Sequence, residues 1–164
     1  MKEVKGDIWD YHKQGKYIVI PTNGTVKING EAVMGRGLAL QAKLKFPCIP
    51  RTIGKYLGIL GTVPIVFQDI KVLTFPVKYN WFEKADVTLI EESCKHLVYM
   101  WYHCKEEVYL PRVGCGNGRL DWKDVKPILE KYLDDRFIIV NNEEEVKPGS
   151  AKDILGGRPF TIRI

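Results

Sequence analysis

Two glycine-rich turns constrain this chain more than any other feature, because each opens a helix-like run after a strand-like run. The first turn is residues 34–37 (Met-Gly-Arg-Gly), and the second is residues 114–118 (Gly-Cys-Gly-Asn-Gly). Glycine lets backbone N–H groups crowd around an anion, and a helix N-terminus adds about half a positive charge aimed at the same place. Two such turns in one small domain predict a ligand that carries two phosphates.

Strand-like and helix-like runs alternate along the chain. Apolar periodicity predicts strands at 16–20, 63–67, 70–75, 106–110 and 136–140, and helices at 36–46, 51–60, 86–102 and 121–134. Gln68 and Asp69 have the spacing of a tight hairpin turn, which predicts one antiparallel strand pair. The fold class expected from this order is α/β, a three-layer α/β/α sandwich with a mixed, mostly parallel central sheet that the run 136–140 closes.

Length and composition are those of one ordinary globular domain. The chain has 164 residues, of which 45% are hydrophobic and 27% charged. We assign residues 1–142 to the domain and residues 143–164 to a C-terminal extension. In the extension Phe160, Ile162 and Ile164 alternate with polar residues, a pattern that predicts an added edge strand.

Several functional classes are disfavoured by the sequence. The four cysteines show no CxxC pair and no zinc-finger spacing with histidine, and no secretory segment precedes them, so we expect reduced thiols in the cytoplasm, no metal and no cofactor. No apolar stretch reaches the ~20 residues that span a bilayer, so no membrane association is expected. The net charge of +5 is dispersed among acidic residues, which makes it weak evidence for nucleic-acid binding.

Four blocks identify a family. Neither glycine turn has the ending of a P-loop or the GxGxxG spacing of a dinucleotide fingerprint, which argues against NTPases and dehydrogenases. However, the blocks at 6–8 (Gly-Asp-Ile), 20–24 (Ile-Pro-Thr-Asn-Gly), 33–39 (Val-Met-Gly-Arg-Gly-Leu-Ala) and 111–116 (Pro-Arg-Val-Gly-Cys-Gly) resemble, in order, those of a macro domain, the ADP-ribose-binding fold. Within that family the chain is most similar to the branch of terminal ADP-ribose glycohydrolase and the DNA ADP-ribosyl glycohydrolase antitoxins.

The resemblance implies an activity and a catalytic residue. The segment 75–78 (Phe-Pro-Val-Lys), followed by Trp81, favours the DNA-directed side of the branch. The implied function is a glycohydrolase that removes ADP-ribose from a macromolecule, with DNA as a candidate substrate. Lys78 would attack the distal ribose if partial burial lowers the pKa of its amine. Alternatively it stays charged and contacts a phosphate, or it is a solvated lysine at a strand end.

The chain departs from the branch at one position. Terminal-glycohydrolase members carry an aspartate in the second glycine loop, and here that position is Gly118. This departure keeps open a second function, an ADP-ribose reader without turnover. A third function, hydrolysis of ADP-ribose-1''-phosphate by a phosphatase, would use the same site and differ only in the leaving group. Asp121 lies nearby, but it is expected to cap the following helix in a variant of the capping box with Asp124.

The resemblance also implies a set of ligand-binding residues. They are Asp7, Ile8, Asn23, Met34, Gly35, Gly37, Leu38, Gly114, Cys115, Gly116, Asn117 and Gly118. Asp7 would accept a hydrogen bond from the adenine amine, a role suited to a buried carboxylate, or it would cap a helix that begins near Trp9. Asn23 would bind ribose hydroxyls or serve as a turn residue. Cys115 is not assigned catalysis, because no histidine lies at a predictable distance.

An aromatic segment follows the lysine. Tyr79, Trp81 and Phe82 would stack on an unpaired base of a modified single strand, or they would pack in the core, with at least one of them expected to point inward. The partners expected are therefore ADP-ribose or an ADP-ribosylated macromolecule, with single-stranded DNA as a candidate. The chain itself is expected to be a monomer.

Overall fold

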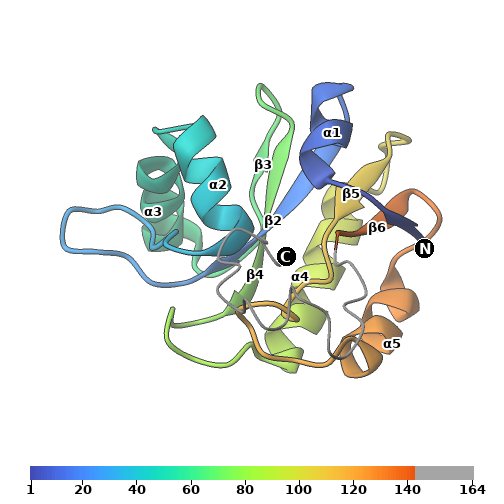
Figure 1. Ribbon diagram of the computed structural model, residues 1–164. Helices are drawn as coiled ribbons and strands as arrows, with labels where there is room; N and C mark the ends of the chain where they lie inside the picture. The colour runs from blue at the N-terminus through green and yellow to red at the C-terminus, as the bar shows by residue number, and fades with distance from the viewer. Residues whose placement is uncertain (143–164) are drawn as a thin grey trace, which may run out of the picture.

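A six-stranded sheet with helices on both faces forms the part of the protein that the computed structural model describes, residues 1–142 (Figure 1). The strands are β1 (Lys2–Lys5), β2 (Tyr17–Asn23), β3 (Val66–Phe67), β4 (Val72–Lys78), β5 (Val108–Leu110) and β6 (Phe137–Asn141). The helices are α1 (Ile8–Lys13), α2 (Gly37–Lys45), α3 (Ile49–Leu60), α4 (Val87–Met100) and α5 (Trp122–Tyr132). The predicted edge strand at 160–164 lies outside the described residues, and the domain boundary stays a prediction.

The sheet is mixed and mostly parallel, as predicted. Its strand order is β1-β6-β5-β2-β4-β3, and within it only β3 and β4 pair in antiparallel fashion, through the predicted hairpin. The expectation that 136–140 closes the sheet is wrong, because β6 lies between β1 and β5. The edge strand β1 has the sequence Lys-Glu-Val-Lys, whose single apolar residue gives no strand periodicity to read.

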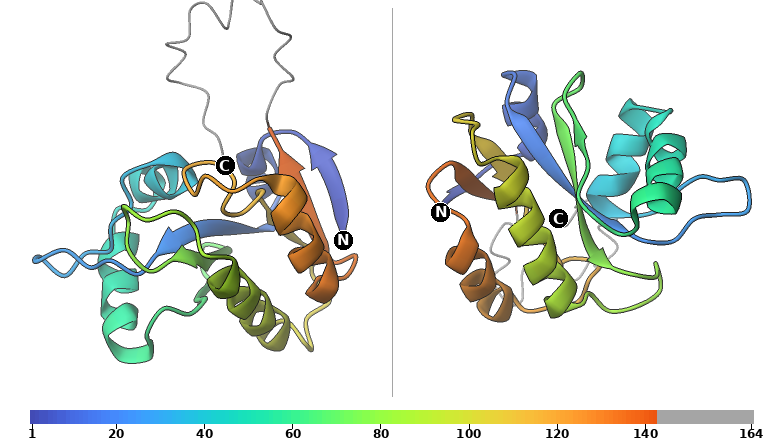
Figure 2. Two further views of the ribbon diagram at one scale, coloured as in Figure 1. Left: turned by 90° about the horizontal axis from the view of Figure 1, so that it is seen from below. Right: turned by 180° about the vertical axis from the view of Figure 1, so that it is seen from behind.

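Alternating side chains of the strands fill two separate cores, one on each face of the sheet. In β2, Tyr17 and Val19 pack against α4 and α5, whereas Ile18 and Ile20 pack against α1, α2 and α3. The helices accordingly form two outer layers: α4 is in front of the sheet when the molecule is seen from behind (Figure 2), and α1 and α2 are in front in Figure 1. This is the α/β/α sandwich expected from the order of elements.

Side-chain caps set the start of some of the described helices but not of others. Asp86 caps α4 by accepting hydrogen bonds from the backbone N–H groups of Thr88 and Leu89, at 2.8 and 3.1 Å. Asp121 does occupy the N-cap position of α5, but its side chain makes no capping hydrogen bond, so the predicted capping box is wrong. Helix α5 ends at Tyr132, slightly before the predicted end.

One segment separates the first glycine turn from its strand. Strand β2 ends at Asn23, and residues 24–36 extend from the body of the protein before α2 begins (Figure 1). Within this segment a single bridge pairs Val26 with Ala32. The sequence had indicated that the first turn directly follows a strand. In the structure it does not, because this segment lies between them. Among the described helices, none is long and apolar enough to cross a bilayer.

Candidate ligand-binding site

The two glycine turns meet at one pocket of about 470 Å³. It opens at the carboxyl ends of β2 and β4, the usual ligand position in open α/β sheets. The predicted site residues that line it are Asn23, Met34, Gly35, Gly37, Leu38, Lys78, Gly114, Gly116, Asn117 and Gly118. Its volume is within the range of pockets that hold nucleotide-sized ligands. The expectation that both turns serve one ligand is therefore consistent with the tertiary structure.

The first turn presents backbone to the pocket. Met34 and Leu38 are buried, at 2% and 4% exposure, and they anchor the turn on the core beneath α1–α3. Between them Gly37 has a φ of 58°, which favours glycine, and α2 starts there. The first N–H groups of a helix have no partner within it, and Arg36 at the N-cap makes no side-chain capping bond. The start of α2 is thus suited to receive an anion.

The second turn is held by hydrogen bonds within itself. Gly114 has a φ of 77°, and its carbonyl accepts from the N–H of Leu120 at 3.0 Å. The N–H of Arg119 donates to the carbonyl of Gly116 at 3.1 Å, and the carbonyl of Gly118 accepts from Ala85 at 2.9 Å. These bonds fix the loop against the segment that follows β4.

Gly118 has no room for a side chain. A Cβ atom there would lie 2.8 Å from the Cβ of Ala85 and 2.8 Å from the carbonyl carbon of Gly114. Both neighbours are held in place, one by the core and one by the loop's own hydrogen bonds. An aspartate at this position, which the family resemblance would lead one to expect, therefore cannot be accommodated here without moving backbone.

We expect Gly118→Ala to destabilise the fold. The clash should lower the free energy of unfolding by about 1–3 kcal/mol, as overpacking does elsewhere. Urea unfolding of the variant measures this, with Gly58→Ala as the matched control. A Cβ on Gly58, in helix α3, meets nothing within 4 Å, so that change should stabilise by about 0.5–1 kcal/mol. Equal stability of the two variants would contradict the close packing at Gly118.

Lys78 is the last residue of β4 and lies beside Asn23, the last residue of β2. It is half-buried, and it lines the pocket between the two turns. Burial lowers the pKa of the Lys78 amine, and the positive charges of Arg119 and Arg36 lower it further, against a smaller opposing effect of Glu83. The amine is therefore closer to its neutral, nucleophilic form than an exposed lysine.

The pocket is electropositive. Its lining contains the cations Lys27, Arg36 and Lys78, and none of the described residues that line it is acidic. Such a lining, with two sets of backbone amides, favours a polyanionic ligand.

Similar proteins carry the same fold. No model of a known protein family matches this chain. The macrodomain of Thermus aquaticus DarG superposes with a TM-score of 0.70 at 26% identity, over 87% of this chain and 97% of that one. Thermosipho africanus DarTG, solved in complex with ADP-ribose, gives a TM-score of 0.69 at 20% identity, over 94% of this chain and 44% of that one. The chain folds as a macro domain.

In sequence, this macro domain is similar to ADP-ribosyl glycohydrolases. The DNA ADP-ribosyl glycohydrolase of Thermus aquaticus is 27% identical over 132 residues, which are 74% of this chain and 37% of the relative. The human ADP-ribose glycohydrolase OARD1 is 24% identical over 111 residues, 65% of this chain and 71% of the relative. The chain spans about a third of the length of the DNA ADP-ribosyl glycohydrolases that it matches.

Three of the residues that were predicted to bind the ligand do not line the pocket: Asp7, Ile8 and Cys115. Asp7 is exposed, not buried, and it caps α1 by accepting from the N–H of Trp9 at 2.9 Å, so its capping role is confirmed. Ile8 is fully buried in the core. The thiol of Cys115 contacts the carbonyl of Val113 at 3.5 Å. Contacts of these residues with a ligand stay predictions.

Asn23 lines the pocket, and its side chain also makes hydrogen bonds with the backbone of the following segment. Its amide nitrogen donates to the carbonyl of Val33 at 3.0 Å, and its amide oxygen accepts from the N–H of Thr25 at 2.9 Å. These bonds hold the start and end of the segment 24–36 together. The turn role is thus confirmed, while a contact with ribose stays a prediction.

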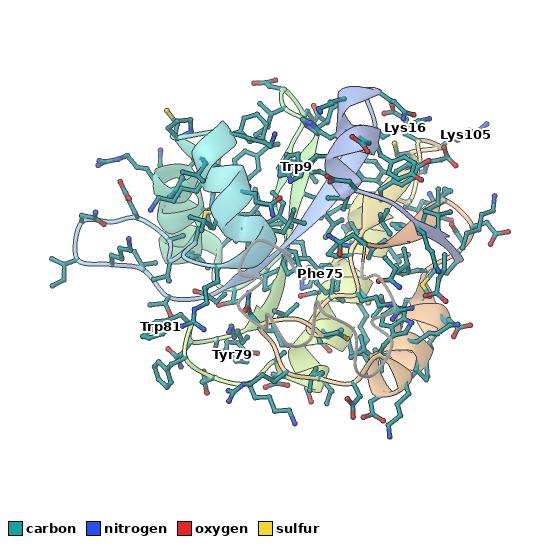
Figure 3. All side chains as sticks on the ribbon, viewed as in Figure 1. Trp9, Lys16, Phe75, Tyr79, Trp81 and Lys105 are labelled. Carbon is teal, nitrogen blue, oxygen red and sulfur yellow. The ribbon has the colours of Figure 1, made fainter. Side chains whose placement is uncertain are left out.

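The aromatic segment after Lys78 faces outward. Tyr79, Trp81 and Phe82 are 50%, 51% and 66% exposed, so the expectation that at least one of them points inward is wrong. Trp81 lines the pocket, and its backbone N–H donates to the Thr25 hydroxyl at 3.0 Å. The ring of Trp81 meets that of Phe82 edge to face. Figure 3 shows Tyr79 and Trp81 near one another, at the opposite end of the molecule from Lys16 and Lys105.

Sequence reasoning missed two cations near the pocket, Lys27 and Arg119, and gave Arg36 no role. Arg36 sits inside the first glycine turn, so its position alone was a usable signal. Lys27 lies in the extended segment 24–36, where no pattern indicates which side chains face the pocket. The effect of Arg119 depends on a contact between distant parts of the chain.

Proposed function

We propose that this macro domain removes ADP-ribose from a modified nucleic acid, with Lys78 as the nucleophile. The observation that carries the proposal is the position of Lys78, half-buried in an electropositive pocket between two glycine turns, with a lowered pKa. Backbone amides of the turns would bind the diphosphate and leave the distal ribose next to the amine. The names of the similar proteins, glycohydrolases acting on ADP-ribosylated DNA or on ADP-ribose linkages, support the same reaction class.

The proposed chemistry proceeds in two steps. The neutral amine of Lys78 attacks the anomeric carbon of the distal ribose, and a C–N bond forms as the bond from that carbon to the macromolecule breaks. The macromolecule leaves with the electron pair and gains a proton. Water then attacks the same carbon and loses a proton to solvent, while the C–N bond breaks and its electron pair returns to the Lys78 nitrogen. ADP-ribose is released and Lys78 is free again.

The pocket mouth favours a nucleic acid over an acidic protein side chain as the carrier of ADP-ribose. Exposed aromatic rings stack on unpaired bases, and cations contact the backbone phosphates. Both kinds of side chain are present at the mouth, as Trp81 and Lys27. The deciding experiment follows free ADP-ribose released from ADP-ribosylated single-stranded DNA, RNA and protein. Release from none of the three, under conditions where a known glycohydrolase clears them, would refute the proposal.

The second candidate function is a reader, a protein that binds ADP-ribose without hydrolysing it. Two observations favour it: Gly118 has no room for a side chain, and none of the described residues that line the pocket is acidic. Without a placed carboxylate, proton transfer depends on solvent or on the leaving group. Calorimetry with ADP-ribose combined with the release assay separates the two. Tight binding with no product from any substrate, including phosphate from ADP-ribose-1''-phosphate, identifies a reader.

Trp81→Ala tests the nucleic-acid side of the proposal. Loss of one stacking surface should weaken binding of an ADP-ribosylated oligonucleotide by about 5- to 150-fold, the equivalent of 1–3 kcal/mol. Affinity for free ADP-ribose should change much less. Tyr99→Ala is the matched control, because Tyr99 is an exposed aromatic on α4 that does not line the pocket. Equal weakening of both ligands, or of both variants, would contradict base stacking at Trp81.

A further inference from the structure

We propose that the segment 24–36 is an arm that binds the nucleic-acid strand beside the modified nucleotide, with Ile28 at its tip packing against a neighbouring base. The inference rests on the nucleic-acid substrate of the proposed function. It adds to that function a contact outside the pocket, and this contact would distinguish a modified strand from free ADP-ribose.

The arm folds as a short hairpin with a hydrogen-bonded turn. The N–H of Gly30 donates to the carbonyl of Lys27 at 2.9 Å, and the N–H of Lys27 donates to the carbonyl of Glu31 at 2.8 Å. Gly30 has a φ of 86°, so the connection is a tight turn followed by a glycine in the left-handed region, a common form of hairpin loop. The side chain of Asn29 accepts from the N–H of Glu31 at 3.0 Å. Ile28 therefore stands at the tip of a well-bonded turn.

The arm is held at its base and braced against helix α3. The hydrogen bonds of the Asn23 side chain join the two ends of the segment. The N–H of Ala32 donates to the carbonyl of Pro50 at 2.8 Å. Gly54 of α3 lies so close to the arm that a Cβ there would collide with the carbonyl of Gly30. A contact made by such an arm costs little ordering when a ligand binds.

The side chain of Ile28 is fully exposed, and its exposed fraction is the highest among the large apolar side chains described. Single exposed apolar residues are common on protein surfaces, so exposure alone indicates little. The turn does not require an isoleucine, however, because polar residues are usual in such turns. Isoleucine is among the apolar residues that proteins insert between bases, and the tip of a braced hairpin can present it to a base.

The arm leads directly out of the pocket. Lys27 lines the pocket, and the Cα of the next residue, Ile28, lies about 3.8 Å from that of Lys27. Trp81 also lines the pocket, and its backbone N–H donates to the hydroxyl of Thr25 in the arm at 3.0 Å. Trp81 lies on the side of the molecule from which the arm extends (Figure 3). Because stacked nucleotides follow one another at about 3.4 Å, the neighbour of a modified nucleotide would lie within reach of Ile28.

The charge of the arm favours a polyanionic strand over a second copy of this chain. Its cations are Lys27 and Arg36, and Glu31 is its single acid. The carboxylate of Glu31 lies 4.0 Å from the guanidinium of Arg51 on α3, which partly offsets its charge. Cations that contact phosphates beside an apolar group that contacts a base are the usual elements of strand binding. A second copy, with the same net charge of +5, would instead be repelled.

Ile28→Ala is the deciding variant, because a fully exposed side chain can be removed without loss of packing. Binding of an ADP-ribosylated single-stranded oligonucleotide is measured by fluorescence anisotropy in a Lys78→Ala parent, so that the ligand is not hydrolysed. We expect about 5- to 30-fold weaker binding, since the burial of most of an isoleucine side chain is lost. Affinity for free ADP-ribose and the midpoint of thermal unfolding should equal those of the parent.

Two further variants control for the loss of an apolar side chain. Ile28→Phe keeps an apolar surface at the tip, so it should bind the modified strand at least as tightly as the parent. Leu44→Ala removes an exposed apolar side chain from α2 that does not line the pocket, and it should leave the affinity unchanged.

A modified strand whose flanking nucleotides are abasic tests which part of the ligand the tip contacts. The parent and Ile28→Ala should bind this strand equally, because no neighbouring base is left to pack on. A difference of the same size on the abasic strand would overturn the proposal. Equal affinity of the two proteins for the intact strand would also overturn it, as would a dimer that dissociates in Ile28→Ala, since the tip would then join two copies of the chain.

These binding measurements separate the arm from the proposed hydrolysis. If the affinity difference is present but the wild-type protein releases ADP-ribose from no substrate, the arm is supported and only the hydrolytic function has failed. If the wild-type protein hydrolyses the modified strand and Ile28→Ala changes neither its affinity nor its rate, the arm alone is refuted.

Discussion

Lys78→Ala is expected to abolish release of ADP-ribose from a modified strand, with a loss of at least about 10³-fold in rate, the scale seen when a nucleophile is removed. Binding of ADP-ribose should persist, because the anion contacts that we propose come from the backbone of the glycine turns and need no side chain at position 78. The measurement is single-turnover release of ADP-ribose together with calorimetry on the same preparation. Loss of rate with retained affinity places Lys78 in the chemistry rather than in ground-state binding.

The matched control is Lys105→Ala. Lys105 is exposed and lies at the far end of the molecule from Trp81 and Tyr79 (Figure 3). This variant removes the same charge without touching the pocket, so its rate should equal that of wild type. If Lys78→Ala keeps more than about a tenth of the wild-type rate, the amine is not the nucleophile. The alternative in which Lys78 stays charged and contacts a phosphate would then account for a loss of affinity instead.

Gly35→Glu is expected to abolish measurable binding of ADP-ribose without unfolding the protein. Gly35 is exposed at the pocket wall, and a Cβ there meets nothing within 4 Å, so a side chain fits in the ligand-free protein. Its carboxylate would lie where the diphosphate is expected. At ~4 Å in a partly screened setting, like-charge repulsion costs about 2–4 kcal/mol, a loss of about 30- to 1000-fold in affinity.

Gly35→Gln separates charge from size in the same experiment. Glutamine has nearly the same shape as glutamate and no charge, so it should weaken binding by a smaller factor. Thermal unfolding of all three proteins should give similar midpoints, since the position is open. If wild-type affinity survives Gly35→Glu, the diphosphate does not contact the first glycine turn, and the ligand lies elsewhere.

Local patterns predicted much of the fold. Helix α4 was expected from apolar residues at helical spacing with Asp86 before them, and the structure has Asp86 capping that helix. The β3–β4 hairpin followed from two apolar runs around a short polar turn. Apolar periodicity does not indicate strand β1, because an edge strand covered on little of its surface needs few apolar residues. The capping box at Asp121 failed because spacing alone does not fix a side-chain rotamer.

The site was predictable in its backbone and much less so in its side chains. The glycine turns stand out because glycine is required where chain conformation or close approach excludes a Cβ, as at Gly37 and Gly118. The outward orientation of Tyr79, Trp81 and Phe82 was not readable, since aromatic residues are common both in cores and at binding surfaces.

The sequence by itself determined the order of most strands and helices and the positions of the two glycine turns, since these depend on neighbouring residues and on the absence of side chains. Only the tertiary structure decided which charges surround Lys78. Arg36 and Arg119 belong to segments far from Lys78 along the chain, and they act on it because parallel pairing of β2 with β4 and β5 gathers the strand ends at one edge of the sheet. Electrostatic interactions depend on distance in space, which no local pattern encodes.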